Sequence, residues 1–159
     1  MTARLLLVHS PLVGPATWDQ VAADLAGEGY EVSVPDLAGT VMAGPPYALR
    51  LARWLPPWSR WWGDEALAEL IPDPAKRQHF AAGCPRLPLA MFEEIHPPAP
   101  QWPDAPAAYL QLSEAYQDEA ARARELGWPV TELMSRHLAP LTDPGRVAGS
   151  LRELIGRLG

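Results

Sequence analysis

The order strand, helix, strand occurs near each end of this 159-residue chain, and it limits the fold more than any other feature of the sequence. Residues 4–9 contain a continuous apolar run, which is typical of a strand buried on both faces of a parallel sheet. A helical pattern over about 17–27, with Thr17 and Gln20 as a capping-box pair, and a strand pattern over 30–35 complete a β-α-β unit. Near the other end the same order is predicted over 107–112, 117–126 and 130–134. We therefore expect an α/β fold with a small three-layer sheet of about four mainly parallel strands.

The middle of the chain, residues 37–106, has a different composition and is rich in proline and tryptophan. Prolines favour helix starts and forbid helix interiors, so this segment is predicted to form several short helices separated by prolines. Asp73 and Pro74 predict one helix start, and Asp143 and Pro144 predict the start of the last helix of the chain. The short helices expected in this segment cover about 47–55, 64–71, 74–83 and 88–95.

The charge and composition of the chain exclude several classes of partner. The net charge is −6 and Lys76 is the only lysine, which disfavours nucleic acid and anionic lipid. No apolar run approaches the roughly 18 residues of a membrane span, and the first apolar run is too short for a signal peptide, so we expect a cytoplasmic protein. The single cysteine, Cys84, allows no intrachain disulfide, and Gly83-Cys84-Pro85 predicts a helix end rather than a nucleophile.

Three segments together resemble the α/β-hydrolase family. Residues 5–18, Leu-Leu-Leu-Val-His-Ser-Pro-Leu-Val-Gly-Pro-Ala-Thr-Trp, look like its first long strand, oxyanion loop and following helix. Residues 34–37 look like the end of the next strand, and residues 137–147 look like the loop that carries the catalytic histidine into the last helix. The resemblance covers both flanks of the chain and implies a single α/β-hydrolase-like domain over 1–159. It also implies that the helical segment 37–106 is a lid-like insertion.

The chain departs from this family at the nucleophile. None of its six serines, nor Cys84, has glycine at both positions of the G-x-S-x-G turn. About two β-α units, on the order of 60 residues, are missing near 45–53. The resemblance then implies that the strand ending at His9 pairs directly with the strand at 107–112, or that a second subunit, most simply in a homodimer, covers the exposed strands. An unfolded or partner-dependent chain is the alternative.

The candidate catalytic residue is His137, which follows a predicted strand at the edge where α/β folds bind ligands. Imidazole titrates near neutral pH and suits proton transfer. The resemblance places Glu114, after the preceding strand, where a triad carboxylate would orient His137. The alternatives are an inherited histidine with a local hydrogen bond and a solvated glutamate at a helix start.

The candidate substrate-binding residues come from the first loop and from the tryptophan-rich segment. By resemblance, the loop of His9, Ser10, Leu12 and Val13 offers backbone N–H groups as an oxyanion hole. Ser10 is a poor candidate nucleophile there, and His9 is more simply a core histidine that fixes the backbone. Trp54, Trp58, Trp62 and their neighbours Trp61, Trp102, Met91 and Phe92 would line an apolar pocket, or else form the core of the helical insertion.

Two further motifs carry no site. Glu93-Glu94-Ile95-His96 lacks a third ligand and the spacing of a zinc motif, so we predict no metal. The segment from Gly39 to Gly44 has the glycine spacing of a phosphate loop, but Pro45-Pro46 replaces its Lys-Ser/Thr.

These residues lead to two hypotheses from different classes, so whether the chain is an enzyme stays open at this point. The first is an enzyme without a serine nucleophile that performs cofactor-free acid/base chemistry, of cyclisation, isomerisation or lyase type, on a small hydrophobic molecule. The second is a non-catalytic ligand-binding or partner-dependent protein derived from a hydrolase. A third possibility is that a partner chain supplies the nucleophile.

Overall fold

The computed structural model describes residues 4–10, 12–37, 54–92 and 105–158. The chain forms two compact units, residues 1–96 and residues 97–159, each with its own core. Both units combine helices with short parallel strands, so the chain is of mixed α/β class. Each unit is described separately below.

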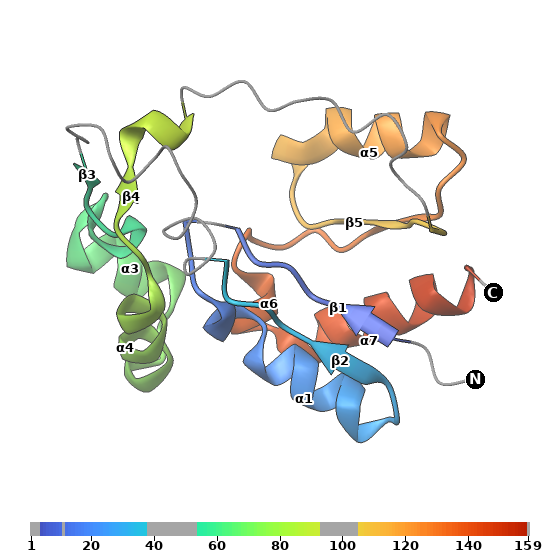
Figure 1. Cartoon of the computed structure of the whole chain (residues 1–159), viewed down its shortest axis with the longest axis horizontal. Coiled ribbons are helices and arrows are strands. Elements are labelled where there is room, and N and C mark those ends of the chain that lie inside the picture. Colours follow the sequence, from blue (N-terminus) through green and yellow to red (C-terminus); the bar gives the residue numbers. More distant parts are fainter. Residues whose placement is uncertain (1–3, 11, 38–53, 93–104, 159) are drawn as a thin grey trace. The chain divides into compact units, whose positions relative to one another are not determined.

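The N-terminal unit begins with the predicted β-α-β arrangement (Figure 1). Strand β1 (Arg4–Leu6) pairs in parallel with β2 (Glu31–Ser33), with Leu5 opposite Val32. Between them lie the 3-10 helix η1 (Pro15–Thr17) and helix α1 (Asp19–Gly27). Val21 and Leu25 of α1 are fully buried and supply its apolar face.

Two details of this unit differ from prediction. The Thr17 hydroxyl donates to the Gly14 carbonyl inside η1, at 3.0 Å, so it is not available to cap α1, and the capping box does not form. The second difference concerns the strand expected over 4–9. Strand β1 covers only residues 4–6 and is not buried on both faces, because Leu6 is 65% exposed, and Val8, beyond the strand, is 52% exposed.

The rest of the unit is formed by the proline- and tryptophan-rich segment. Its helices are α3 (Gly63–Leu70) and α4 (Pro74–Gly83), close to the predicted ranges. Asp73 caps α4 as predicted, since its carboxylate accepts from the N–H groups of Ala75 and Lys76. These two bonds, and the nearby positive charges, hold the pKa of Asp73 below its ordinary value.

The same segment also contains strands, which the sequence did not predict. Strand β3 (Trp54–Leu55) pairs antiparallel with β4 (Leu87–Pro88), at positions expected to be helical. The predicted helix at 88–95 is replaced by β4 and the 3-10 helix η3 (Leu89–Phe92), within the described part of that range. A further 3-10 helix, η2 (Trp58–Arg60), precedes α3. The many prolines keep each element to a few residues.

The backbone at the start of η1 lies close to the backbone at the end of α4. A Cβ added to Gly14 would lie 2.5 Å from the carbonyl oxygen of Gly83, so only glycine fits at position 14. On the same helix Phe80 is fully buried. The loop after β1 is therefore pressed against α4.

The C-terminal unit is a three-layer arrangement around one parallel strand pair. Strand β5 (Tyr109–Gln111) pairs with β6 (Val130–Glu132) in parallel, as the order of the predicted segments requires. The elements between them are η4 (Glu114–Tyr116) and α5 (Gln117–Glu125), and those after β6 are α6 (Ala139–Thr142) and α7 (Pro144–Gly156). Helices α5 and α7 both contact the strands and lie on opposite sides of them (Figure 1).

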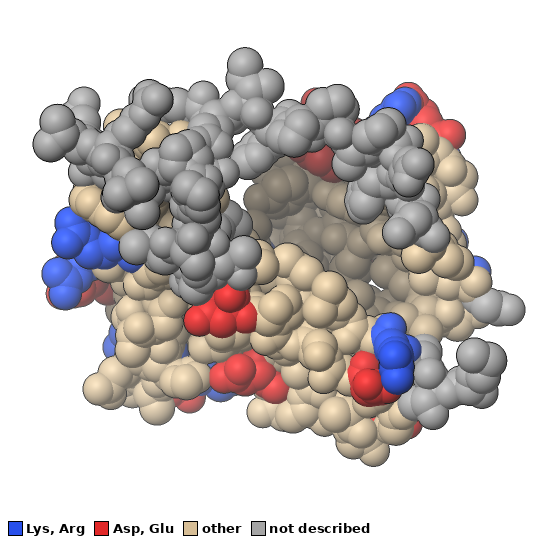
Figure 2. All heavy atoms as spheres, in the orientation of Figure 1, with Lys and Arg blue, Asp and Glu red and all other residues tan. Residues whose placement is uncertain are grey.

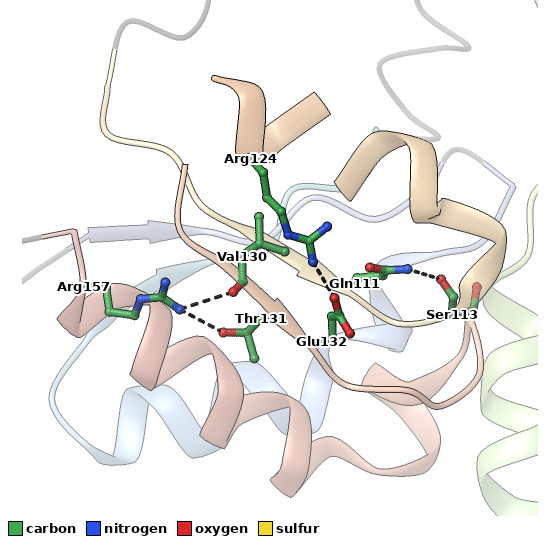
Figure 3. Close-up of polar contacts among 7 residues, drawn as sticks. All are labelled: Gln111, Ser113, Arg124, Val130, Thr131, Glu132 and Arg157. Atoms are coloured by element: carbon green, nitrogen blue, oxygen red, sulfur yellow. Dashed lines mark hydrogen bonds and ion pairs between the residues drawn. The ribbon is translucent and has the colours of Figure 1, made fainter. Parts of the chain in front are cut away.

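Polar contacts tie both helices to β6 (Figure 3). Arg124 of α5 forms an ion pair with Glu132 at the end of β6. From the other layer, Arg157, just after α7, donates to the carbonyl of Val130 and to the hydroxyl of Thr131, at 3.3 and 3.4 Å. The two helices are thereby fixed to the same short strand.

The predicted four-stranded sheet is not seen. The described residues form three separate two-stranded sheets, β1 with β2, β3 with β4, and β5 with β6. The predicted pairing of the strand ending at His9 with the strand at 107–112 is not among these three sheets.

Within the described residues, no helix has both the length and the apolar character needed to cross a bilayer. Figure 2 shows described Lys and Arg side chains (blue) beside Asp and Glu side chains (red) on one face of the molecule.

Candidate functional site

His9 is buried and both of its ring nitrogens are bonded to the backbone. The backbone N–H of Leu37 donates to Nε2 at 3.2 Å, so Nε2 must be unprotonated. Nδ1 therefore carries the proton and donates to the carbonyl of Ser10 at 2.8 Å. At 3% exposure the ring has neither a free nitrogen nor access to a substrate. His9 joins the loop after β1 to the segment after β2, which is the backbone-fixing role that the sequence favoured.

The loop expected to form an oxyanion hole uses its N–H groups internally. The N–H of Leu12 donates to the Ser10 hydroxyl at 3.3 Å, and the N–H of Val13 donates to the Ser10 carbonyl at 3.1 Å. The hydroxyl and the carbonyl of Ser10 thus both accept hydrogen bonds within the same short turn. In this structure neither N–H group is directed to an external anion, and the two nitrogens of the adjacent His9 are occupied, so His9 cannot activate Ser10.

His137 lies in the other unit and has a different kind of partner. Its Nδ1 is 3.0 Å from the hydroxyl of Tyr116, and the two rings stack with centroids 5.7 Å apart. The imidazole is exposed, whereas Tyr116 is half-buried. Among the residues that the structure describes, no hydrogen-bond partner is seen for Nε2.

The parallel strand pair positions these two side chains. Tyr116 ends η4, directly after β5, and His137 follows β6, so both come from the carboxyl ends of neighbouring parallel strands. The pairing continues beyond the strands, because Ser135 donates its N–H to the Leu112 carbonyl at 2.9 Å. The start of the loop after β5 is further held by the buried Gln111, whose side chain donates to a backbone carbonyl two residues on (Figure 3).

The structure does not bring Glu114 to His137. Glu114 is exposed in the first turn of η4, and within the described part of the chain the partner of Nδ1 is Tyr116, two residues later. Positions 114 and 116 lie on different sides of a three-residue 3-10 turn, which decides which side chain reaches the imidazole. The sequence analysis missed Tyr116, although a tyrosine just after a strand at the ligand-binding edge was a usable signal.

The candidate tryptophans at 54, 58, 61 and 62 lie in the N-terminal unit. Trp58 packs edge-on against Trp62 and against buried Phe80, with ring centroids 4.9 and 5.8 Å away. Trp54 pairs with Pro88 in the β3–β4 sheet, and Trp62 is 59% exposed. The cavity described beside Trp58 and Trp62 has a volume of only about 10 Å³, too small for an organic ligand. Within the described residues, Trp58 and Trp62 thus pack against each other and against Phe80.

Cys84 behaves as the structural thiol that the sequence predicted. It follows the last residue of α4, is 7% exposed, and its N–H donates to the Ala81 carbonyl. Burial raises the pKa of the Cys84 thiol above its ordinary value, and hydrogen bonds from Ser59 offset part of this effect. A thiol with a raised pKa is a poor nucleophile.

Some predicted features lie outside the described residues. These are Trp102, the segment from Glu93 to His96, and the glycines at 39 and 44. Within the described residues, no group of three or more His, Cys, Asp or Glu side chains could hold a metal ion.

Comparison of the chain with protein-family models, with curated proteins and with solved structures gave no match. The chemistry of the site therefore has to be inferred from its own residues, above all His137 and Tyr116.

Proposed function

We propose that this chain is a small-molecule enzyme related to the α/β-hydrolases that works without a serine nucleophile and transfers protons through His137. The observation that carries the proposal is the 3.0 Å contact between His137 Nδ1 and the Tyr116 hydroxyl at the carboxyl ends of two parallel strands. Ligands of α/β sheets bind at this edge. The substrate is a small apolar molecule, and the reaction is of cyclisation, isomerisation or lyase type.

The Tyr116 hydroxyl would set the tautomer of His137. When Nδ1 carries the ring proton and donates it to the hydroxyl oxygen, Nε2 is unprotonated and acts as a base. A proton taken from the substrate at Nε2 leaves an imidazolium, and return of a proton from Nε2 to another atom of the substrate restores the neutral ring. The proton count thus balances between the ring and the substrate, so the reaction needs no cofactor.

The relationship to the α/β-hydrolases is supported by two parallel β-α-β units, one with the hydrolase-like loop after its first strand and one with the histidine after its last. The missing G-x-S-x-G turn supports a reaction that does not pass through an acyl-enzyme. A serine-directed fluorophosphonate probe is therefore expected to leave the protein unlabelled, and stoichiometric labelling would contradict the proposal.

The alternative is a non-catalytic ligand-binding protein. One observation favours it: the N–H groups of Leu12 and Val13 are bonded within their own loop, so the oxyanion hole expected by resemblance has no donor there. An enzyme that forms an enolate-like anion would need another donor, and Tyr116 is the described side chain nearest to His137 that can provide one.

Exchange of carbon-bound protons in D₂O separates the two functions. Small apolar ketones, such as phenylacetone and cyclohexanone, are incubated with the protein, and loss of the α-proton signal is followed by NMR. We expect exchange above the buffer rate, a decrease of at least about 100-fold for His137→Asn, and a decrease of about 10-fold for Tyr116→Phe together with a shifted pH profile. Exchange at the buffer rate with every ketone, or exchange unchanged in His137→Asn, would favour the binding protein.

We also propose a homodimer, because Leu6 of β1 and Val8, two residues beyond the strand, expose apolar surface. Analytical ultracentrifugation tests it: a dimer that a Leu6→Glu, Val8→Glu double variant converts to monomer is expected, and a wild-type monomer at high concentration would exclude it.

A further inference from the structure

A pocket of about 450 Å³ lies beside α5 in the C-terminal unit, away from the residues of the proposed proton-transfer site. Its apolar wall consists of Tyr109 from β5, Ala123 and Leu126 from α5 and its end, and Trp128 from the turn that follows. This volume lies within the range of small-molecule sites. Neither the sequence motifs nor the proposed function accounts for this pocket.

The end of α5 is built so that Trp128 faces the pocket. Gly127, at φ +77°, ends the helix in the left-handed region. Its N–H donates to the Arg124 carbonyl at 3.0 Å, and the N–H of Trp128 donates to the Ala123 carbonyl at 3.0 Å. These two bonds form a Schellman motif, in which the residue after the glycine packs on the last turn of the helix. The motif holds Trp128 against Ala123, and both residues line the pocket.

Three charged residues, Asp118, Glu119 and Arg122, lie at the exposed rim of the pocket, whose lining is otherwise almost entirely apolar. They share one face of α5 with the apolar residues. Arg122 forms a 2.8 Å ion pair with Glu125. Asp118 and Glu119 have no ion pair or hydrogen bond with any other described residue. The rim of the pocket therefore carries more negative than positive charge beside its aromatic wall.

The pKa of the Tyr109 hydroxyl is affected by burial and by the charges beside the pocket. Burial, and then the charges of Glu119 and Tyr116, raise the pKa of its hydroxyl above 10.0. The phenol is therefore neutral at physiological pH and adds an aromatic face and a hydrogen-bonding group without further charge.

We propose that this pocket binds a small organic amine, a molecule with an apolar or aromatic body and a protonated nitrogen. The body would lie against Leu126, Trp128 and Tyr109, and the ammonium group would lie near the carboxylates of Asp118 and Glu119. Aromatic faces attract cations as well as apolar groups, so the aromatic wall and the charged rim favour the same class of ligand. An anionic ligand would place its charge next to two carboxylates and is rejected by repulsion.

The test uses two probes of nearly the same shape and opposite charge, 2-phenylethylamine and 3-phenylpropionate, titrated against the full chain with ligand-observed NMR. For a ligand of this size we expect the amine to bind with a dissociation constant on the order of millimolar. The acid is expected to bind at least about 10-fold more weakly. Equal binding of the two probes, or no saturable binding of the amine, would overturn the proposal.

Variants of the two carboxylates test whether the amine binds in this pocket. The isosteric double change Asp118→Asn, Glu119→Gln is expected to weaken amine binding about 10-fold and to remove the preference over the acid. The matched control is Asp64→Asn, Glu65→Gln, since these residues are two exposed carboxylates in the first turn of α3. If the control lowers amine binding as much as the α5 variant does, the amine is held by general surface charge and the proposal is wrong.

A second variant tests the aromatic wall. Trp128→Leu keeps an apolar side chain and is expected to weaken the amine and the acid by the same factor, because it removes ring contact without changing charge. Unchanged binding of the amine in this variant would also overturn the proposed site. Because binding is measured without turnover, these results do not depend on whether His137 is catalytic.

Discussion

The two histidines that follow parallel strands, His9 after β1 and His137 after β6, have opposite surroundings. His9 is 3% exposed, and both of its ring nitrogens form hydrogen bonds with backbone groups of its own unit. His137 is exposed and shares one nitrogen with a side-chain hydroxyl. The same residue type after a parallel strand is thus enclosed in one unit and exposed in the other. The difference lies in the partners: the buried ring bonds to backbone groups through both nitrogens, whereas the exposed ring bonds to one side-chain hydroxyl.

The largest expected difference in stability is between the variants in which each histidine is replaced separately by alanine. His9→Ala leaves a cavity and two buried backbone groups without partners, and should lower the free energy of unfolding by about 3 kcal/mol. His137→Ala removes an exposed ring and should change it by less than about 0.5 kcal/mol. Urea denaturation followed by far-UV circular dichroism measures both. Equal losses would show that the two environments do not differ as described.

Chemical modification compares the two rings in the wild-type protein. Diethyl pyrocarbonate reacts with accessible unprotonated imidazole, so His137 should react readily and His9 only when the structure opens locally. We expect His9 to react on the order of 100-fold more slowly, because buried groups are reached only through opening. Peptide mass spectrometry gives the rates, with the exposed His79 as a reference within the N-terminal unit. Labelling of His9 as fast as that of His137 would contradict the burial of His9 described above.

The packing of the loop that continues from His9 can be tested at two glycines. Gly14→Ala would place Cβ 2.5 Å from the Gly83 carbonyl oxygen, and the required shift should cost about 2 kcal/mol. The control Gly83→Ala meets only ordinary contacts at 3.8 Å and should be neutral or stabilising by up to about 0.5 kcal/mol. Thermal unfolding distinguishes the two variants, and a tolerated Gly14→Ala would show that this loop is looser than the described contacts.

The smallest effect concerns Cys84, a buried thiol of the N-terminal unit whose pKa is shifted. Because burial raises the pKa of the folded thiol, the folded state holds its proton more tightly than the unfolded chain does. The resulting stability is present below the unfolded pKa and is lost as pH rises through the folded value. Unfolding free energies should therefore fall more steeply above pH 9 in the wild type than in Cys84→Ala. Parallel curves for the two proteins would contradict the raised pKa.

Much of the C-terminal unit follows from its sequence pattern. The predicted segments 117–126 and 130–134 contain α5 and β6, and Asp143 and Pro144 mark the start of α7, because apolar periodicity and capping are local properties. In the N-terminal unit the same holds for α4, with Asp73 and Pro74 at its start. Predictions from local sequence patterns were wrong in the proline-rich segment, where β3 and β4 replace predicted helix. Leu55 and Leu87 pair across 32 positions of sequence, and no local signal predicts that pairing.

The sequence by itself determined the two parallel β-α-β units, the absence of a serine nucleophile turn, and the presence of a histidine after the last strand, since these depend on residues close together along the chain. Only the tertiary structure decided that Tyr116 rather than Glu114 reaches His137. It also decided that the N–H groups near Ser10 are bonded within their loop, and that Trp128 rather than the other described tryptophans lines a pocket of ligand size. Side-chain partners depend on the direction in which each turn projects its residues, and that direction is fixed by packing rather than by composition.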